Sequence, residues 1–192
     1  MPVTTLPTDS HDKLELYLSK NYVVVDFMRI AKDRKFPALR DKKITSRLLL
    51  ERTIGGKTMD CLILSIIDGE KRIFDVKSVL TLLIDVKPRM NRIGAMLAQI
   101  NLYSDILSNQ KNNAKQGYSI YRRVMKLIVT TDINEDYDRM MIDQDVFLLY
   151  LAQNIVDNNL KIPKAALSRR DRYLTSAEQV GKKKMYKEAM IN

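Results

Sequence analysis

The sequence predicts an α/β fold with a central mixed β-sheet flanked by helices. Apolar runs at residues 58–67 and 79–86 have the length and the β-branched content of strands. The second run is broken only by Thr81 and Asp85, which is typical of a strand buried on both faces. Between residues 92 and 108 the apolar positions recur at helical spacing instead, so we expect a helix after the strands.

Chain length and composition indicate a globular protein. The 192 residues suffice for one domain with a substantial core, and 45% hydrophobic with 29% charged residues is a globular composition. We expect a single domain over residues 1–160, with its core at about 58–132, followed by a basic C-terminal tail over 161–192. No apolar run approaches the roughly 20 residues that a membrane span needs.

The N-terminus and the cysteine content bear on the compartment. The first ten residues lack the basic and apolar regions of a signal peptide. The single cysteine, Cys61, lies in an apolar strand pattern, so we expect it in the core and without an intrachain disulfide. These features predict an intracellular protein, in the cytoplasm or at the nucleoid or nucleus, that is not secreted.

The charge of the chain favours a polyanionic partner. Its net charge is +10, which fits nucleic acid first and an anionic membrane second. Residues 29–52 hold nine Lys or Arg against three acids, and the tail over 161–192 has the same ratio. The predicted nucleic-acid-binding residues are Arg34, Lys35, Arg40, Lys42, Lys43, Arg89, Arg92, Arg169, Arg170, Lys182, Lys183 and Lys184.

The first third of the chain mixes helical and strand signals. A helix is expected over about 11–20. Residues 22–30 are rich in β-branched and aromatic side chains and predict a strand, although a helix there stays open. Pro37 argues against one continuous helix through the basic stretch over residues 29–52. A second helix is expected over about 43–52, with Glu51 near its end.

Turn signals and later apolar segments complete the expected order of elements. Gly55 to Lys57 predicts a turn, and Asp68-Gly69 predicts a hairpin with a further strand directly after it. Another buried strand is expected over 125–132. Residues 133–144 are expected to form an acidic loop or a short helix, and 145–157 a helix with an apolar stripe.

Two Asp-Val-Lys triplets, at 75–77 and 85–87, lie ten residues apart. Side chains at i and i+2 of a strand point to the same face, so each triplet holds a carboxylate beside an ammonium. Mg²⁺ and Mn²⁺ prefer oxygen ligands such as carboxylates. A nearby cation can orient an attacking water or stabilise a pentavalent phosphorus transition state. The triplets therefore suggest a metal-dependent site that cleaves phosphodiesters.

The stretch over 58–132 resembles the PD-(D/E)XK nuclease superfamily. The second triplet is followed by Gln99-Ile100-Asn101-Leu102-Tyr103, which is similar to the Gln-x-x-x-Tyr motif of the RecB-like branch. The expected order of three strands, a helix and a strand also looks like the core of that superfamily. The resemblance implies a restriction-endonuclease-like core, dependence on Mg²⁺ or Mn²⁺, and cleavage of DNA by a metal-activated water.

The resemblance leaves two sets of site residues open. In the favoured set, Asp75 and Asp85 hold the metal with the carbonyl of Val86, and Lys87 orients the water. In that set Gln99 and Tyr103 steady the site or contact the substrate. The alternative set joins Asp60 to the first triplet across the Asp68-Gly69 turn. The residues of this alternative are Asp60, Asp75 and Lys77, and Glu51 or Glu15 is the expected extra carboxylate.

Other functions remain open from the sequence. A protein with the same fold could bind nucleic acid without cutting it or serve as a subunit of a processing complex, and an RNA endonuclease also fits. A largely helical structural or regulatory protein is the remaining alternative. His11 is expected to be inert, and a homodimer is left open. The sequence does not distinguish DNA from RNA or endonuclease from exonuclease action.

Overall fold

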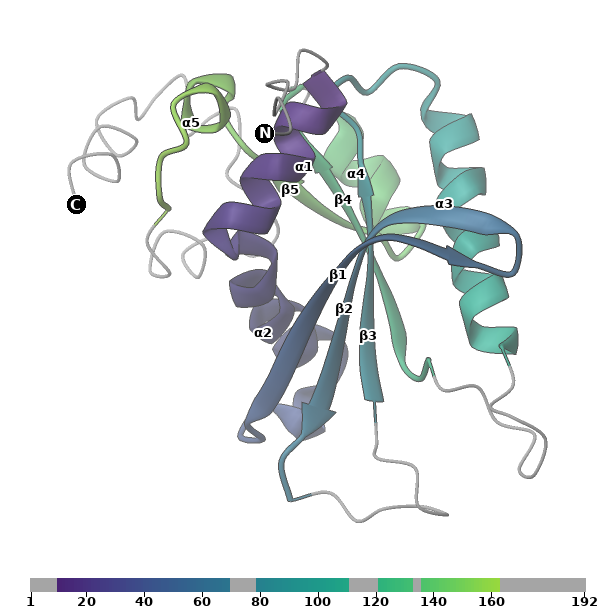
Figure 1. Cartoon of the computed structure of the whole chain (residues 1–192). Helices are drawn as coiled ribbons and strands as arrows, with labels where there is room; N and C mark the ends of the chain where they lie inside the picture. The colour runs from purple at the N-terminus through teal and green to yellow at the C-terminus, as the bar shows by residue number, and fades with distance from the viewer. Residues whose placement is uncertain (1–9, 70–78, 111–120, 133–135, 163–192) are drawn as a thin grey trace, which may run out of the picture.

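A computed structural model of the protein describes residues 10–69, 79–110, 121–132 and 136–162. Within these ranges five strands form one mixed sheet in the order β1-β2-β3-β4-β5. Neighbours are antiparallel from β1 to β3 and parallel from β3 to β5. Helices cover both faces, so the predicted α/β class is confirmed (Figure 1). The strands are β1 Ile44–Ile54, β2 Lys57–Ile67, β3 Val79–Val86, β4 Val124–Thr130 and β5 Phe147–Tyr150.

Two groups of helices enclose two apolar cores. α1 and α2 pack on one face of the sheet with α5, whereas α3 and α4 pack on the other (Figure 1). Cys61 is buried in the first core, as expected. In the described ranges, none of the helices has the length and apolar character needed to cross a membrane. The helices are α1 Ser10–Asn21, α2 Val23–Lys35, the 3₁₀ turn η1 Pro37–Leu39, α3 Ile93–Asn109, α4 Asp136–Asp143 and α5 Gln153–Asp157.

The central strand β3 carries the side chains discussed below. Ile84 of β3 pairs with Cys61 of β2 on one side and with Leu127 of β4 on the other. Every side chain from Leu80 to Val86 is buried. A strand covered on both faces needs an almost continuous apolar run, which this segment provides. The strand predicted over 79–86 is therefore confirmed.

The strand predicted over residues 22–30 is wrong, because this segment forms most of α2. Its buried residues include Val24, Phe27 and Ala31, which recur at helical spacing and face the first core. The period of the apolar positions matters more here than the β-branched content, since a helix buries one stripe of side chains.

The helix predicted over residues 43–52 is also wrong, because the segment is the edge strand β1. β1 pairs with β2 along its length through the turn at Gly55 and Gly56, whose φ angles of 57° and 77° suit glycine. Pairing with a neighbouring strand is a tertiary contact, so the weak helical spacing of Ile44 and Leu48 could not reveal it.

The helix predicted over residues 145–157 is wrong in its first half. Phe147–Tyr150 is β5 and pairs in parallel with β4, while α5 covers only Gln153–Asp157. Leu148 to Tyr150 are buried one after another. Consecutive side chains of a strand point to opposite faces, so this burial pattern requires cover on both sides.

The other expected elements agree with the structure. Residues 133–144, expected as loop or short helix, include α4. The further strand expected after Asp68-Gly69 falls outside the described residues. The confirmed elements are the helices at 11–20 and 92–108 and the strands at 58–67 and 125–132.

The β1–β2 hairpin bends at Glu51, whose φ of 48° lies in the left-handed region. Residues on both sides of Glu51 pair with β2, but Glu51 itself has no partner in the register of the described strands. Beyond the bend the tip of the hairpin reaches α3 (Figure 1). There a Cβ on Gly55 would lie 2.6 Å from Cγ2 of Ile106, so the contact has room only for glycine.

This contact makes a testable prediction about stability. Gly55→Ala should lower the free energy of unfolding by about 1–3 kcal/mol more than Gly56→Ala, because both replacements strain a positive φ but only the first overpacks. A Cβ on Gly56 would meet nothing within 4 Å. Urea unfolding of the two variants measures the difference, and equal losses would contradict the packing of the hairpin tip on α3.

Candidate active site

Asp85 and Lys87 lie at the carboxyl end of β3 and point to the same side. The Nζ of Lys87 is 3.4 Å from Oδ1 of Asp85. The Asp85 side chain is only 7% exposed, whereas that of Lys87 is 26% exposed and reaches solvent. The backbone N–H of Lys87 donates to the carbonyl of Val129, so β4 holds this end of the strand in place.

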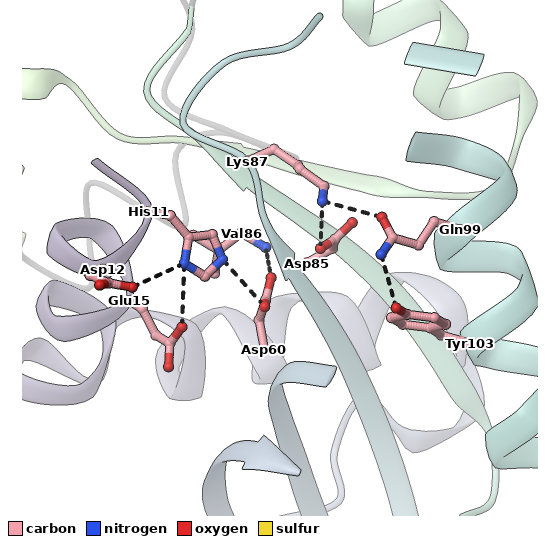
Figure 2. A network of polar contacts seen from close by, with 9 residues as sticks. All are labelled: His11, Asp12, Glu15, Asp60, Asp85, Val86, Lys87, Gln99 and Tyr103. Atoms are coloured by element: carbon pink, nitrogen blue, oxygen red, sulfur yellow. Dashed lines mark hydrogen bonds and ion pairs between the residues drawn. The ribbon is translucent and has the colours of Figure 1, made fainter. Parts of the chain in front are cut away.

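Asp60 of β2 joins Asp85 through the backbone of β3. The β2–β3 ladder stops at the pair of Cys61 and Ile84, one residue short of Asp60. The N–H of Val86 therefore donates to Oδ2 of Asp60 at 2.8 Å instead of to a strand carbonyl. This bond places the Asp60 carboxylate next to that of Asp85, at the point where the two strands separate (Figure 2).

The N-terminal turn of α1 supplies an imidazole and a carboxylate. Nε2 of His11 lies 3.3 Å from Oδ1 of Asp60, and its Nδ1 lies 3.7 Å from Oε2 of Glu15. His11 and Glu15 are four residues apart, so they share one face of the helix. One ligand atom from each of His11, Glu15 and Asp60 lies within 4.8 Å of the others (Figure 2).

Two polar residues of α3 face the same site from the opposite side. Nζ of Lys87 donates to Oε1 of Gln99 at 3.2 Å, and Nε2 of Gln99 donates to the Tyr103 hydroxyl at 2.9 Å. Gln99 and Tyr103 are one helical turn apart on the same face. The ammonium of Lys87 can only donate, so the oxygen of the Gln99 amide faces the lysine and its NH₂ group faces Tyr103 (Figure 2).

Burial and crowding make the carboxylates of this site hard to ionise. Burial raises the pKa of Asp85 to about 7, Lys87 opposes that rise, and the neighbouring Asp60 adds to it. Burial also raises the pKa of Glu15 to about 8, with further contributions from the carboxylates of Glu51 and Asp60.

The same carboxylates favour the charged form of the His11 imidazole. Burial lowers the pKa of His11, but the carboxylates of Asp60, Asp12 and Glu15 together outweigh it and raise the pKa above its ordinary value. The carboxyl groups gathered here come from α1, β1, β2 and β3, and they are those of Glu15, Glu51, Asp60 and Asp85. Such crowding persists in a folded protein when a bound cation or shared protons offset it.

The chemistry of the donors fits a divalent cation. Oδ2 of Asp85 is buried and accepts no hydrogen bond in the described structure. An unpaired buried carboxylate oxygen is costly, and a metal ion is one of the partners that can satisfy it. Carboxylate oxygens with one imidazole are ligands that Mg²⁺ or Mn²⁺ accepts. The residues present therefore fit the metal that the sequence led us to expect.

The structure brings together members of both sets of predicted site residues. Asp85, Lys87, Gln99 and Tyr103 of the favoured set converge, and Asp60 of the alternative set lies beside them. The remaining members of the two sets, Asp75 and Lys77, fall in the segment 70–78, outside the described residues.

Three side chains near these residues extend the predicted site. Glu51 and Glu15, the two candidates for an extra carboxylate, both lie beside it. His11, which was expected to be inert, lies on α1 and contacts Asp60. The sequence feature that could have indicated a role for His11 was its four-residue spacing from Glu15 in the helix predicted over about 11–20.

The predicted nucleic-acid-binding residues lie at several places. Arg40, Lys42 and Lys43 line a cavity between α2 and β1. Arg34 and Lys35 line a smaller one next to β5, where Lys35 forms an ion pair with Asp145. Arg89 and Arg92 follow β3 in the loop before α3. The predicted residues Arg169, Arg170, Lys182, Lys183 and Lys184 fall outside the described residues.

Comparison with known proteins yields distant structural similarity only. No family model matches the sequence, and no curated protein matches it. The fold is similar to that of a repair endonuclease from Pyrococcus abyssi, with 12% identity, a TM-score of 0.37, and coverage of 70% of this chain and 46% of that one.

Two further solved structures are similar at 12% identity. The EndoMS-dsDNA2 complex has a TM-score of 0.39 and coverage of 79% of this chain and 48% of that one. The MspJI restriction endonuclease in complex with a 27-mer oligonucleotide has a TM-score of 0.30 and coverage of 83% and 34%. This chain spans less than half the length of each matched chain, and similarity at this level identifies no activity.

The raised pKa of Asp85 predicts how the metal-free protein responds to pH. The folded state binds the proton of Asp85 more tightly than the unfolded chain, so stability falls as pH rises from about 4 to about 7. Asp85→Asn removes this dependence and should raise the Tm at pH 8 in EDTA, by about 2–4 °C for each kcal/mol relieved. At pH 4 the two proteins should unfold at nearly the same temperature.

Thermal unfolding monitored by circular dichroism tests this, with Asp105→Asn as the control. Asp105 is an exposed carboxylate of α3, so its replacement removes the same charge without affecting the site. A lower Tm for Asp85→Asn at pH 8 would contradict the carboxylate crowding described above.

Proposed function

We propose that the protein is a metal-dependent nuclease that cleaves DNA phosphodiester bonds. The observation that carries the proposal is the convergence of Asp60, Asp85 and Lys87 where β2 and β3 separate. Two adjacent carboxylates can hold a metal ion and a neighbouring ammonium can stabilise negative charge, and both effects promote hydrolysis of a phosphodiester.

We assign the metal to Asp60 and Asp85, with the carbonyl of Val86 as a further ligand, and Mg²⁺ or Mn²⁺ as the ion. Asp60 is already oriented toward Asp85 by the N–H of Val86, and His11 lies against the other oxygen of Asp60. When bound, the ion supplies a water of lowered pKa and positive charge beside the phosphate.

Lys87 has a separate role in the proposal. Its ammonium contacts both the carboxylate of Asp85 and the amide oxygen of Gln99, and these two contacts fix its orientation. The ammonium reaches solvent, so it can donate a further hydrogen bond to a water or to a phosphate oxygen. We therefore infer that Lys87 orients the attacking water and stabilises negative charge that develops on the phosphate.

The order of the elements supports membership of the PD-(D/E)XK superfamily. Asp60 on β2, Asp85-Val86-Lys87 on β3 and Gln99-x-x-x-Tyr103 on α3 follow one another in the sequence and meet in space. The five-stranded sheet excludes the largely helical protein that the sequence left open. A nucleic-acid-binding protein without activity and an RNA nuclease are compatible with the same fold. The cleavage assay described next distinguishes them from a DNA nuclease.

The first test is cleavage by wild-type protein of linear, circular and single-stranded DNA and of RNA, with Mg²⁺, Mn²⁺ or EDTA. Cleavage of DNA should require the metal. Asp60→Asn, Asp85→Asn and Lys87→Ala should each lower the rate on the order of 10²–10⁴-fold, because each removes a metal ligand or the cation beside the phosphate. Asp105→Asn and Lys20→Gln, which remove exposed charges outside the contacts described for the site, should retain activity.

Asp75→Ala and Lys77→Ala decide between the two sets of residues. Retained cleavage in both variants supports the site built on Asp60 and Asp85. Loss of cleavage in both, with activity kept in Asp85→Asn and Lys87→Ala, would move the site to the first triplet. Salt-sensitive DNA binding without cleavage on any substrate would favour the non-catalytic binder.

The contact between Gln99 and Tyr103 gives a finer prediction. Tyr103→Phe removes the hydroxyl that accepts from the Gln99 amide, so the Gln99 side chain keeps only its contact with Lys87 and is held less firmly. A lost hydrogen bond of about 1 kcal/mol corresponds to a fall in kcat of roughly fivefold, with KM nearly unchanged. Tyr22→Phe, at an exposed tyrosine, is the matched control. An increase in KM alone would indicate that Tyr103 binds substrate instead.

A further inference from the structure

A second cationic feature lies away from the candidate active site. A cavity of about 560 Å³ is enclosed by α2, by the segment 40–43 and by the first residues of β1. Asp68, at the end of β2, completes its lining. The cationic side chains that line this basic cavity are Arg29, Lys32, Arg40, Lys42 and Lys43.

The wall of the basic cavity is fixed by a buried lysine. Lys32 is 1% exposed, and its Nζ donates to the carbonyls of Leu39, at 2.5 Å, and Arg40, at 3.3 Å. The same ammonium is 2.7 Å from the carboxylate of Asp33. These bonds tie the turn after α2 to the helix itself, so Arg40 is presented from a fixed backbone.

Four of the five cations are available to a ligand. Arg29, Arg40, Lys42 and Lys43 are exposed. Their side chains make no hydrogen bond or ion pair within the described part of the chain. Converging cations without partners repel one another, and an anion between them relieves that repulsion.

Three carboxylates also line the basic cavity, and they limit what it can bind. These are Asp26, Asp41 and Asp68, and since Lys32 pairs with Asp33, the four available cations exceed these acids by one. The Asp68 carboxylate accepts from the hydroxyl of Thr45 at 3.4 Å. A surplus of this size suits a singly charged phosphodiester better than a free polyphosphate, because a polyphosphate brings more charge than the surplus can neutralise.

The edge strand β1 connects the basic cavity to the candidate active site. The strand begins at Ile44, in the cavity lining, and reaches the bend at Glu51, opposite Asp60 (Figure 1). Its exposed side includes Arg47. Asp68 directly follows β2 and is eight positions from Asp60, so a strand rise of about 3.3 Å per residue separates the two sites by about 25 Å.

We propose that the basic cavity anchors a backbone phosphate of the nucleic acid about 25 Å from the cleaved bond, with β1 as the path between them. This deepens the proposed function and rests on it for the position of the cut. A rise of 3.4 Å per base pair puts the anchor about seven base pairs from the cleavage position. Contact with phosphate alone gives affinity without sequence preference.

Binding in EDTA tests the anchor independently of cleavage. Arg40→Gln/Lys43→Gln should weaken binding of a 24-base-pair duplex, measured by fluorescence anisotropy. It should also reduce the slope of log affinity against log salt by about one to two, one for each lost phosphate contact. Lys20→Gln/Lys161→Gln is the matched control, because it removes two exposed lysines near α1 and α5 and keeps the slope. An unchanged slope in the Arg40/Lys43 variant would overturn the anchor.

Cleavage with Mg²⁺ tests where the anchor lies. On the 24-base-pair duplex the Arg40/Lys43 variant should have a lower kcat/KM, whereas on a hairpin with a six-base-pair stem it should match the wild type. An equal loss on both substrates would contradict an anchor at this distance. A changed binding slope without any cleavage would support the cavity as a phosphate site and refute the nuclease. Cleavage with an unchanged slope would support the nuclease and overturn the anchor.

A free phosphate ligand is distinguished in a separate arm. Thermal shift with pyrophosphate and with AMP should show no stabilisation that depends on Arg40 and Lys43. Strong stabilisation of wild type but not of the variant, with duplex binding unaffected, would make the cavity a nucleotide or phosphate site and overturn the anchor. Circular dichroism of the variant confirms that its fold is intact, as expected for two exposed positions.

Discussion

The site depends on the hydrogen bond from the N–H of Val86 to the carboxylate of Asp60. At this point the β2–β3 ladder has ended, and the side chain of Asp60 replaces the carbonyl that a continuing strand would offer. The β1–β2 hairpin is then free to bend at Glu51 and to reach α3. One interrupted ladder thereby opens the sheet, leaves Asp85 beside the gap and gives α1 access to Asp60.

This arrangement favours ligand binding over the stability of the metal-free protein. Asp85 is buried with one oxygen unpaired, and Glu15 is held among other carboxylates. Side chains selected for stability alone would be paired or apolar at such positions, because buried unpaired charge is costly. Burial of the carboxylates on a rigid central strand also means that a ligand finds them already in place, with little reorganisation needed on binding.

The sequence revealed the parts of the fold that rest on local pattern. The buried strand β3 and the helix α3 follow from an unbroken apolar run and from helical spacing, and with them came Asp85, Lys87, Gln99 and Tyr103. The choice between Asp60 and Asp75 depends on which strands pair and where the ladder ends, and no local pattern encodes this. His11 could not be placed for the same reason, since its neighbour Asp60 is 49 positions away in the chain.

Two of the three segments that local pattern misassigned contribute to the lining of the basic cavity. Residues 22–30 are a helix with β-branched side chains, and residues 43–52 are a strand rich in charge. Charge on an edge strand has an ordinary use, because it prevents pairing with other chains, and that use accounts for Arg47. It does not account for a buried lysine that fixes the turn carrying Arg40, or for exposed cations that converge on one hollow. Local preference and tertiary structure often disagree at functional sites, and for the basic cavity we propose that the function is to hold a phosphate.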